Sequence, residues 1–139
     1  MLGRFTLAQL VESRLAIESF IARRACEVGE MEEFDALELN IETTAKIPLT
    51  NWDARLASYG EFLNVFIGAA HNPLLTELAK PLIESTAQLV RRLGPRPKDE
   101  FLKFRRQLVA ALKERDPDRA SAVVVQTMKY IYKSLSSRA

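Results

Sequence analysis

The chain has 139 residues, of which 47% are apolar and 27% are charged, and its formal net charge is +2. This length corresponds to one domain with enough apolar residues for a core, and the small net charge gives no argument for a nucleic-acid or membrane partner. No apolar run is long enough to span a bilayer, and the N-terminus lacks the unbroken apolar segment of a signal peptide.

The first two predicted helices cover the N-terminal third of the chain. The first runs from about Thr6 to Cys26, and Thr6 with Gln9 has the spacing of a capping box. Gly29 ends this segment, and the second helix is predicted from Glu30 to Ala45. Both have a wide apolar face, which is typical of helices packed against a core.

The third predicted helix begins at a cap on Thr50 or Asn51 and ends at His71. Its stretch "FLNVFIGAA" is apolar almost all round. Such a helix must be enclosed by other helices, so it lines a packed core, a metal site or a small-molecule pocket.

The fourth helix is predicted to restart at once. Asn72 is a suitable N-cap, and Pro73 stands at the first helical position, where its missing N–H costs nothing. Pro81 lies inside this helix, and we expect it to kink the helix and to free a carbonyl near Glu77.

Two further helices follow the loop "LGPRPKDE". The fifth is predicted from about Asp99 to Arg115, and the sixth from Pro117 to Leu135 after a cap at Asp116. No segment alternates with period two, so no strand is expected. The sequence therefore predicts one all-α domain over residues 1–139, an antiparallel bundle of about six helices.

The residue inventory argues against catalysis. His71 is the only histidine, Cys26 is the only cysteine, and no glycine-rich phosphate loop is present. Metal sites of the zinc or di-iron type would need several histidine or cysteine ligands. We therefore expect no enzyme, no metal and no other cofactor. One cysteine also excludes an internal disulfide and fits a reducing compartment, so a cytoplasmic protein is expected.

Basic residues are frequent between Arg91 and Arg119. They alternate with glutamate and aspartate on long amphipathic helices and do not form a short helix-turn-helix unit. The pattern is typical of a solvated face rather than of a DNA-binding surface.

Three stretches resemble one known family. "LVESRLAIESFIARRAC" resembles the opening helix of the ligand-sensing C-terminal domain (FCD, FadR-type) of GntR-family transcription regulators, which typically reads L-x-E-x-R-x-x-[IL]-E-x-x-x-A-x-x-A. "FLNVFIGAAHNPLL" is similar to the family's F-H-x-x-[LF]-x-x-A-A-G-N-P-L-L, and "LVAALKERDPDRA" to I-L-x-A-L-x-x-x-D-x-x-x-A. The matching residues are Leu10, Glu12, Arg14, Ile17, Glu18, Ala22, Ala25, Phe62, Phe66, Ala69, Ala70, Asn72, Pro73, Leu74, Leu75, Leu108, Val109, Ala111, Leu112, Asp116 and Ala120.

The resemblance implies an all-α effector-binding domain that dimerises. In the family it is normally joined to an N-terminal winged helix that binds operator DNA. We expect that winged helix to be absent from this chain. Operator DNA would be contacted only through the winged helix, and this chain alone would not bind DNA specifically. His71 replaces the usual glycine before Asn-Pro, a position that often takes the left-handed conformation, which histidine tolerates better than most bulky residues.

The family's metal ligands are missing. Many members hold a divalent metal with one aspartate and three histidines, and by resemblance those positions are Tyr59, Leu63, Arg105 and Thr127 here. None of the four supplies a usual ligand, and Arg105 would repel a cation. The resemblance therefore points to the metal-free members, of which fatty-acyl-CoA sensors are the known example.

The predicted ligand-binding residues follow from these positions. The set comprises two arginines that could hold an anion, two hydroxyls and two apolar side chains: Arg14, Arg105, Tyr59, Thr127, Leu63 and Phe66. The expected partners are an anionic organic acid or an acyl-CoA type of effector and a second copy of the chain. For Arg14, a structural pair with Glu12, Glu18 or another acid is an equal alternative. For Arg105 the alternative is the solvated face beside Arg106, and for Tyr59 and Thr127 a core hydrogen bond is the favoured role. For the domain, the alternative is a helical dimerisation module whose pocket has filled in.

Overall fold

The computed structural model describes residues 4–95 and 100–138. Within these ranges the chain forms six helices and no strand, which confirms the predicted fold class. The helices are α1 (Leu7–Val28), α2 (Met31–Ala45), α3 (Trp52–Gly68), α4 (Pro73–Leu93), α5 (Phe101–Lys113) and α6 (Pro117–Ser136). None of the helices in these ranges is both long and apolar enough to cross a lipid bilayer.

The predicted helix starts are mostly confirmed. Thr6 and Gln9 form a reciprocal capping box on α1, and the side chains of Asn72 and Asp116 cap α4 and α6 ahead of a proline. Asn51 precedes α3, although its side chain makes no capping hydrogen bond. Local capping chemistry in the sequence thus sets where three of the six described helices begin.

Several helix ends differ from the prediction, and the first helix continues to Val28 instead of ending at Cys26. The third helix ends at Gly68 instead of His71, because Ala69 and Ala70 close a turn with backbone hydrogen bonds back to residues 65–67. The fifth helix begins at Phe101, and its predicted start at Asp99 lies outside the described residues. Helix α5 ends at Lys113, two residues before the predicted end, since Arg115 leaves the helical region with a φ of 53°.

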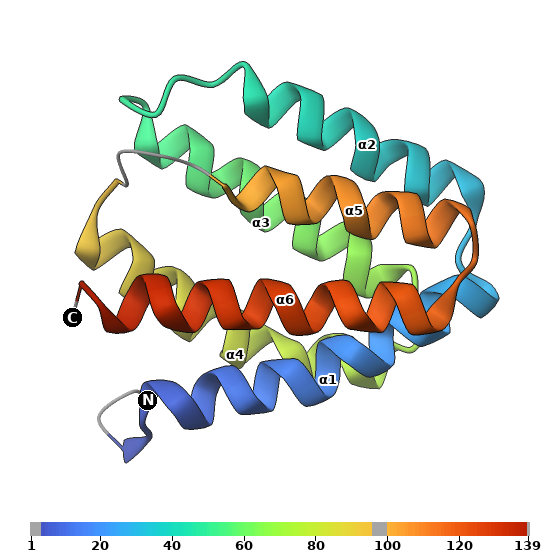
Figure 1. The fold of residues 1–139 in the computed structure, drawn as a ribbon, viewed down its shortest axis with the longest axis horizontal. Coiled ribbons are helices and arrows are strands. Elements are labelled where there is room, and N and C mark those ends of the chain that lie inside the picture. The colour runs from blue at the N-terminus through green and yellow to red at the C-terminus, as the bar shows by residue number, and fades with distance from the viewer. Residues whose placement is uncertain (1–3, 96–99, 139) are drawn as a thin grey trace.

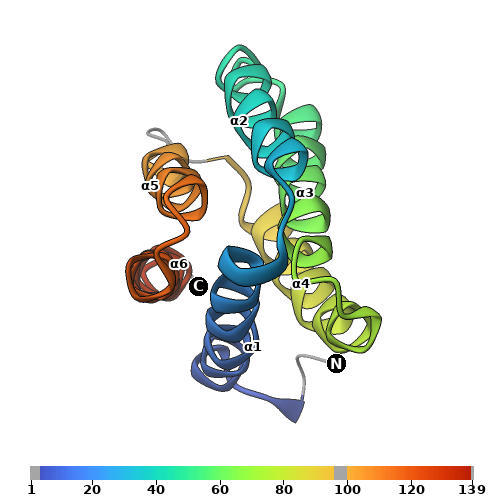
Figure 2. The same ribbon diagram turned by 90° about the vertical axis from the view of Figure 1, so that its right-hand side faces the viewer.

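Helices α1 and α6 run antiparallel side by side along one flank, and α2, α3 and α5 form the opposite part of the bundle (Figures 1 and 2). Helix α4 packs mainly on α1 and α3. Phe62, Phe66 and Ile67 of α3 are almost completely buried, which confirms that other helices enclose this segment. The core therefore surrounds α3, and any internal site must use its side chains.

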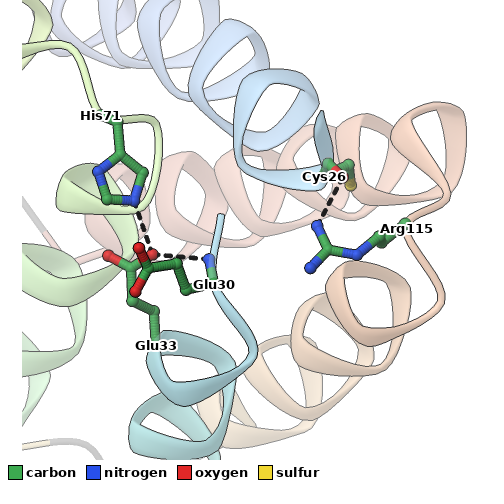
Figure 3. A network of polar contacts seen from close by, with 5 residues as sticks. All are labelled: Cys26, Glu30, Glu33, His71 and Arg115. Carbon is green, nitrogen blue, oxygen red and sulfur yellow. Dashed lines mark hydrogen bonds and ion pairs between the residues drawn. The ribbon is translucent and has the colours of Figure 1, made fainter. Parts of the chain in front are cut away.

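The junction between α1 and α2 is held from two sides (Figure 3). His71 Nε2 lies 2.8 Å from Glu33 Oε1, and the same carboxylate oxygen accepts a hydrogen bond from the Glu30 N–H at 2.8 Å. On the other side, Arg115 Nη1 donates to the Cys26 carbonyl at 3.0 Å. His71 and Arg115 are the only non-glycine residues with positive φ in the described part of the chain, at 51° and 53°.

The left-handed conformation expected at His71 is therefore confirmed. Both left-handed residues follow a helix, and both turn the chain so that a side chain reaches the α1–α2 connection. The corners between α3 and α4 and between α5 and α6 thus fix the same junction.

Candidate ligand pocket

A cavity of about 100 Å³ lies beside α3, with walls from α1, α3, α4, α5 and α6. Its lining is mainly aliphatic, and the polar side chains at its wall include Arg14, Tyr59, Thr86 and Arg105. A largely apolar wall with a few polar groups is the usual character of a small-molecule site. The volume is well below the several hundred Å³ expected of a sensor for a drug-sized ligand, about 300–1,000 Å³.

A second cavity of about 20 Å³ adjoins the first. Four side chains line both spaces and so form the partition between them: Arg14, Leu63, Phe101 and Arg105. Two cationic side chains thus stand at the centre of the bundle, next to both cavities.

Arg14 is buried and is bonded to the only acid among the described buried side chains. Its Nε donates to Glu18 Oε2 at 2.6 Å, and both residues are about 5% exposed or less. The pair forms because residues four apart lie on the same face of a helix. This is the structural pairing considered as the alternative for Arg14. It uses only Nε, and the terminal guanidinium nitrogens have no hydrogen-bond partner among the residues that the structure describes.

Arg105 lies inside the bundle, as the resemblance predicted. It is 3% exposed, and its Nη1 donates to the backbone carbonyl of Tyr59 at 3.2 Å. The guanidinium also lies against three aromatic rings, with its carbon 4.2 Å from the centroid of Phe62, 4.4 Å from Phe101 and 5.2 Å from Tyr59. Cation–π contacts of this kind compensate part of the cost of burying a charge.

The hydroxyl of Tyr59 is held by a residue that the sequence analysis missed. Arg55 is buried, and its Nε donates to Tyr59 Oη at 3.2 Å while Nη1 donates to the Ile47 carbonyl. The signal was present in the sequence, because Arg55 and Tyr59 are spaced i,i+4 on the enclosed helix. Arg55 therefore positions a pocket wall without lining the pocket itself.

The other three predicted site residues also reach the two cavities. Leu63 lines both, while Phe66 and Thr127 line the smaller one. The Thr127 hydroxyl donates to the Val123 carbonyl at 2.9 Å, one turn earlier in α6. The six predicted residues thus come from four helices and meet around one divided space.

The residues at this centre do not fit a divalent metal. The positions at which the resemblance places the family's ligands hold a phenol, an isobutyl group, a guanidinium and a threonine hydroxyl. The described residues also contain no group of three or more histidine, cysteine, aspartate or glutamate side chains that could hold a metal ion. The buried guanidinium of Arg105 is positively charged and would repel a cation at this centre.

Comparison with known proteins agrees with this architecture. The profile of the FCD domain family matches residues 9–129, which is most of the chain. The uncharacterized HTH-type transcriptional regulator YcbG of Bacillus subtilis (strain 168) is 22% identical over 125 residues, which are 90% of this chain and 52% of YcbG. The solved structure of E. coli McbR/YncC superposes with a TM-score of 0.85 at 16% identity, covering 96% of this chain and 69% of that chain.

The chain belongs to the FCD domain family. It is therefore of the class formed by the ligand-binding and dimerisation domains of GntR-type transcription regulators, and this class is not one of enzymes. The chain spans about half the length of the curated relative that it matches.

Proposed function

We propose that this FCD domain senses a small organic acid without a metal, and that Arg14 binds the carboxylate. The observation that carries the proposal is the geometry of Arg14. Its Nε is engaged by Glu18, which orients the guanidinium, and the Arg14 side chain lines both cavities. A guanidinium edge of this kind can hold a carboxylate through two parallel hydrogen bonds. Leu63 and the aliphatic wall would then contact the apolar part of the ligand.

The size of the cavity favours a small acid over an acyl-CoA. A volume of about 100 Å³ suits a short carboxylate, whereas an acyl-CoA is far larger than this space. An acyl-CoA would have to displace α4 or the partition between the cavities. The effector class that we favour is therefore the short-chain monocarboxylates.

One observation favours a second function, a dimerisation module whose pocket has filled in. The Arg105 side chain is packed among three rings at the position where the resemblance places a metal ligand, and the adjoining cavity is only about 20 Å³. The Arg105 side chain could then fill the space that a metal ion and its ligand would otherwise occupy, and form part of the core. A direct binding experiment separates the two functions.

In the whole regulator, we propose that operator DNA is contacted by a winged helix and not by this bundle. The support is the HTH-type designation of YcbG, which is about twice as long as the matched region. The basic side chains between Arg91 and Arg119 include Arg106 and Arg119, which form ion pairs with Glu42 and Glu114 on the bundle surface. Such pairing is typical of a solvated surface.

The test is thermal unfolding of the chain in the presence of linear carboxylates from acetate to octanoate, with octanoyl-CoA as a separate arm. A ligand that binds only the folded state raises the melting temperature as its concentration exceeds its Kd. We expect a rise with short acids, a decline as the acid lengthens, and none with octanoyl-CoA. If no carboxylate changes the melting temperature, the sensing function is wrong and the filled-in module is supported.

Arg14→Lys and Gly60→Ala test whether the carboxylate binds in the larger cavity. Arg14→Lys keeps a positive charge beside Glu18 but removes the guanidinium fork, so carboxylate affinity should fall roughly 10-fold, which corresponds to about 1.4 kcal/mol. Arg14→Met is less informative, because an unpaired buried Glu18 would itself cost about 3–5 kcal/mol of stability. In Gly60→Ala, the new methyl group meets no atom within 4 Å and narrows the larger cavity, so the variant should stay folded and bind less well.

A further inference from the structure

A shallow apolar groove follows the outer side of the α1–α6 pair. Its volume is about 370 Å³, and it shares no lining residue with the larger internal cavity. Apart from two charged residues, its lining consists of Ala8, Val11 and Leu15 from α1 with Val125, Met128 and Tyr132 from α6. Tyr132 is 43% exposed, which is a high value for a large aromatic side chain. An apolar strip along two helices is typical of a surface that another helix pair covers.

Glu12 and Lys129 are the two charged residues of this groove, and they have opposite signs. Both are exposed, and in the described part of the chain neither forms an ion pair or a side-chain hydrogen bond. By contrast, Arg23 of α1 forms an ion pair with Asp118 of α6 at 2.8 Å. The groove thus carries one acid and one base that have no partner among the described residues of their own chain.

The register of α1 and α6 places these two charges at the same level. Glu12 lies eleven residues before Arg23 in α1, and Lys129 lies eleven residues after Asp118 in α6. Because the two helices run antiparallel (Figure 1), both steps lead about three turns in the same direction from the Arg23–Asp118 pair. Glu12 and Lys129 therefore lie at about the same level, one on each side of the groove.

This placement discriminates between two ways of covering the groove with a second copy. A two-fold axis parallel to the helices lays α1 of one copy over α6 of the other, so that each Glu12 meets the Lys129 of its partner. A two-fold axis that crosses the helices at the level of Glu12 lays α1 over α1 and brings Glu12 against Glu12. Only the first arrangement is electrostatically complementary, and it makes the same contact twice, as a two-fold interface requires.

We propose that the α1–α6 groove is the homodimer interface of this domain, and that it forms an antiparallel four-helix arrangement with two reciprocal Glu12–Lys129 contacts. The proposal identifies the surface through which two copies associate and the orientation of one copy relative to the other. It depends on neither the ligand nor Arg14.

The experiment uses sedimentation equilibrium of the 139-residue chain and of two charge-reversal variants. Glu12→Lys gives each copy two positive groove charges, and Lys129→Glu gives each copy two negative ones. Each variant alone should self-associate at least roughly 10-fold more weakly than the unmodified chain, because like charges then meet at both contacts. An equimolar mixture should form a heterodimer close to the unmodified dimer in strength, since each new lysine then meets a new glutamate.

Recovery in the mixture can come only from contacts between copies, so it separates the proposed interface from effects inside one chain. A mixture that associates no better than its components would overturn the proposal, as would an unmodified chain that stays monomeric at high concentration. Tyr132→Glu tests the apolar part and should also abolish the dimer. Leu39→Glu, at a leucine that is 68% exposed on α2, is the matched control and should leave it intact. Circular dichroism of all variants checks that each is folded, and dissociation by Leu39→Glu alone would place the interface elsewhere.

Discussion

His71 Nε2 lies 2.8 Å from Glu33 Oε1, and this contact joins the corner between α3 and α4 to the first turn of α2. The backbone of His71 is left-handed, with a φ of 51°, and the preceding turn is what brings its ring to Glu33. A side chain thus makes a useful contact from a backbone conformation that most side chains avoid.

Two substitutions separate these effects at His71. In His71→Gly the contact is lost but the left-handed strain disappears, whereas in His71→Ala the contact is lost and the strain remains. Left-handed geometry costs a non-glycine residue about 1–2 kcal/mol, and both variants lose the same contact with Glu33. We therefore expect the glycine variant to be about 1–2 kcal/mol more stable than the alanine variant in urea unfolding. Equal stabilities would show that the left-handed conformation is not strained here.

Arg55 should matter far more for stability than a surface arginine. Removing its side chain in Arg55→Ala leaves the Ile47 carbonyl and the Tyr59 hydroxyl without this donor in a buried region. Each hydrogen bond lost from a buried side chain costs about 0.5–1.5 kcal/mol, so the free energy of unfolding should fall by about 1–3 kcal/mol. Arg106→Ala is the control, because its exposed pair with Glu42 should contribute at most about 1 kcal/mol. A similar loss in both variants would contradict this role for Arg55.

Cys26 makes stability depend on pH in the alkaline range. Burial of the thiol raises its pKa, and the nearby Asp116 carboxylate adds to this shift. The folded state therefore keeps the proton at a pH where the unfolded state, with a pKa of about 8.5, loses it, so stability falls as the pH rises above that value.

The measurement is urea unfolding between about pH 7.5 and pH 9.5, compared with Cys26→Ala. The stability of the unmodified chain should decline more steeply with pH than that of the variant, in which this proton is absent. The folded chain should also react slowly with a thiol reagent and react fully once unfolded. Parallel pH profiles for the two proteins would count against a raised pKa in the folded state.

Gly29 and Gly68 should respond to alanine in opposite directions. A Cβ at Gly29 would lie 2.5 Å from the Ala25 carbonyl oxygen and 2.7 Å from Phe34 Cζ, so the α1–α2 junction would have to move. We expect Gly29→Ala to destabilise by about 1–3 kcal/mol. At Gly68, in the last turn of α3, a Cβ meets nothing within 4 Å, and alanine should stabilise by about 0.5–1 kcal/mol. Thermal unfolding of the two variants side by side tests both signs.

The features that could be predicted from the sequence are those set by local chemistry. Capping residues such as Thr6 and Asn72, and the all-round apolar character of α3, are visible in short stretches, and the structure confirms them. The placement of Arg105 in the interior came from the resemblance, because a lone arginine in an amphipathic helix can equally face solvent.

Contacts between distant segments could not be predicted in the same way. The i,i+4 spacing of Arg14 and Glu18 favours their pairing, but whether the pair is buried depends on the rotation of α1 against the bundle. The Arg115–Cys26 and Arg105–Tyr59 bonds join residues 89 and 46 positions apart, and no spacing rule covers such pairs. The cavity volume depends on how all the side chains pack together, which periodicity does not describe.

Pro81 interrupts the hydrogen bonding of α4 beside the larger cavity. Proline has no N–H, so the Glu77 carbonyl one turn earlier lacks its helical hydrogen bond, although α4 continues through this point. The part of α4 beyond Pro81 supplies one wall of the larger cavity, through Ile83, Thr86 and Val90. Since α4 packs mainly on α1 and α3, this half could swing outward while the α1–α6 pair stays closed. If an effector enters by this movement, α4 would govern the rates at which it enters and leaves, whereas Arg14 of α1 would govern its equilibrium affinity.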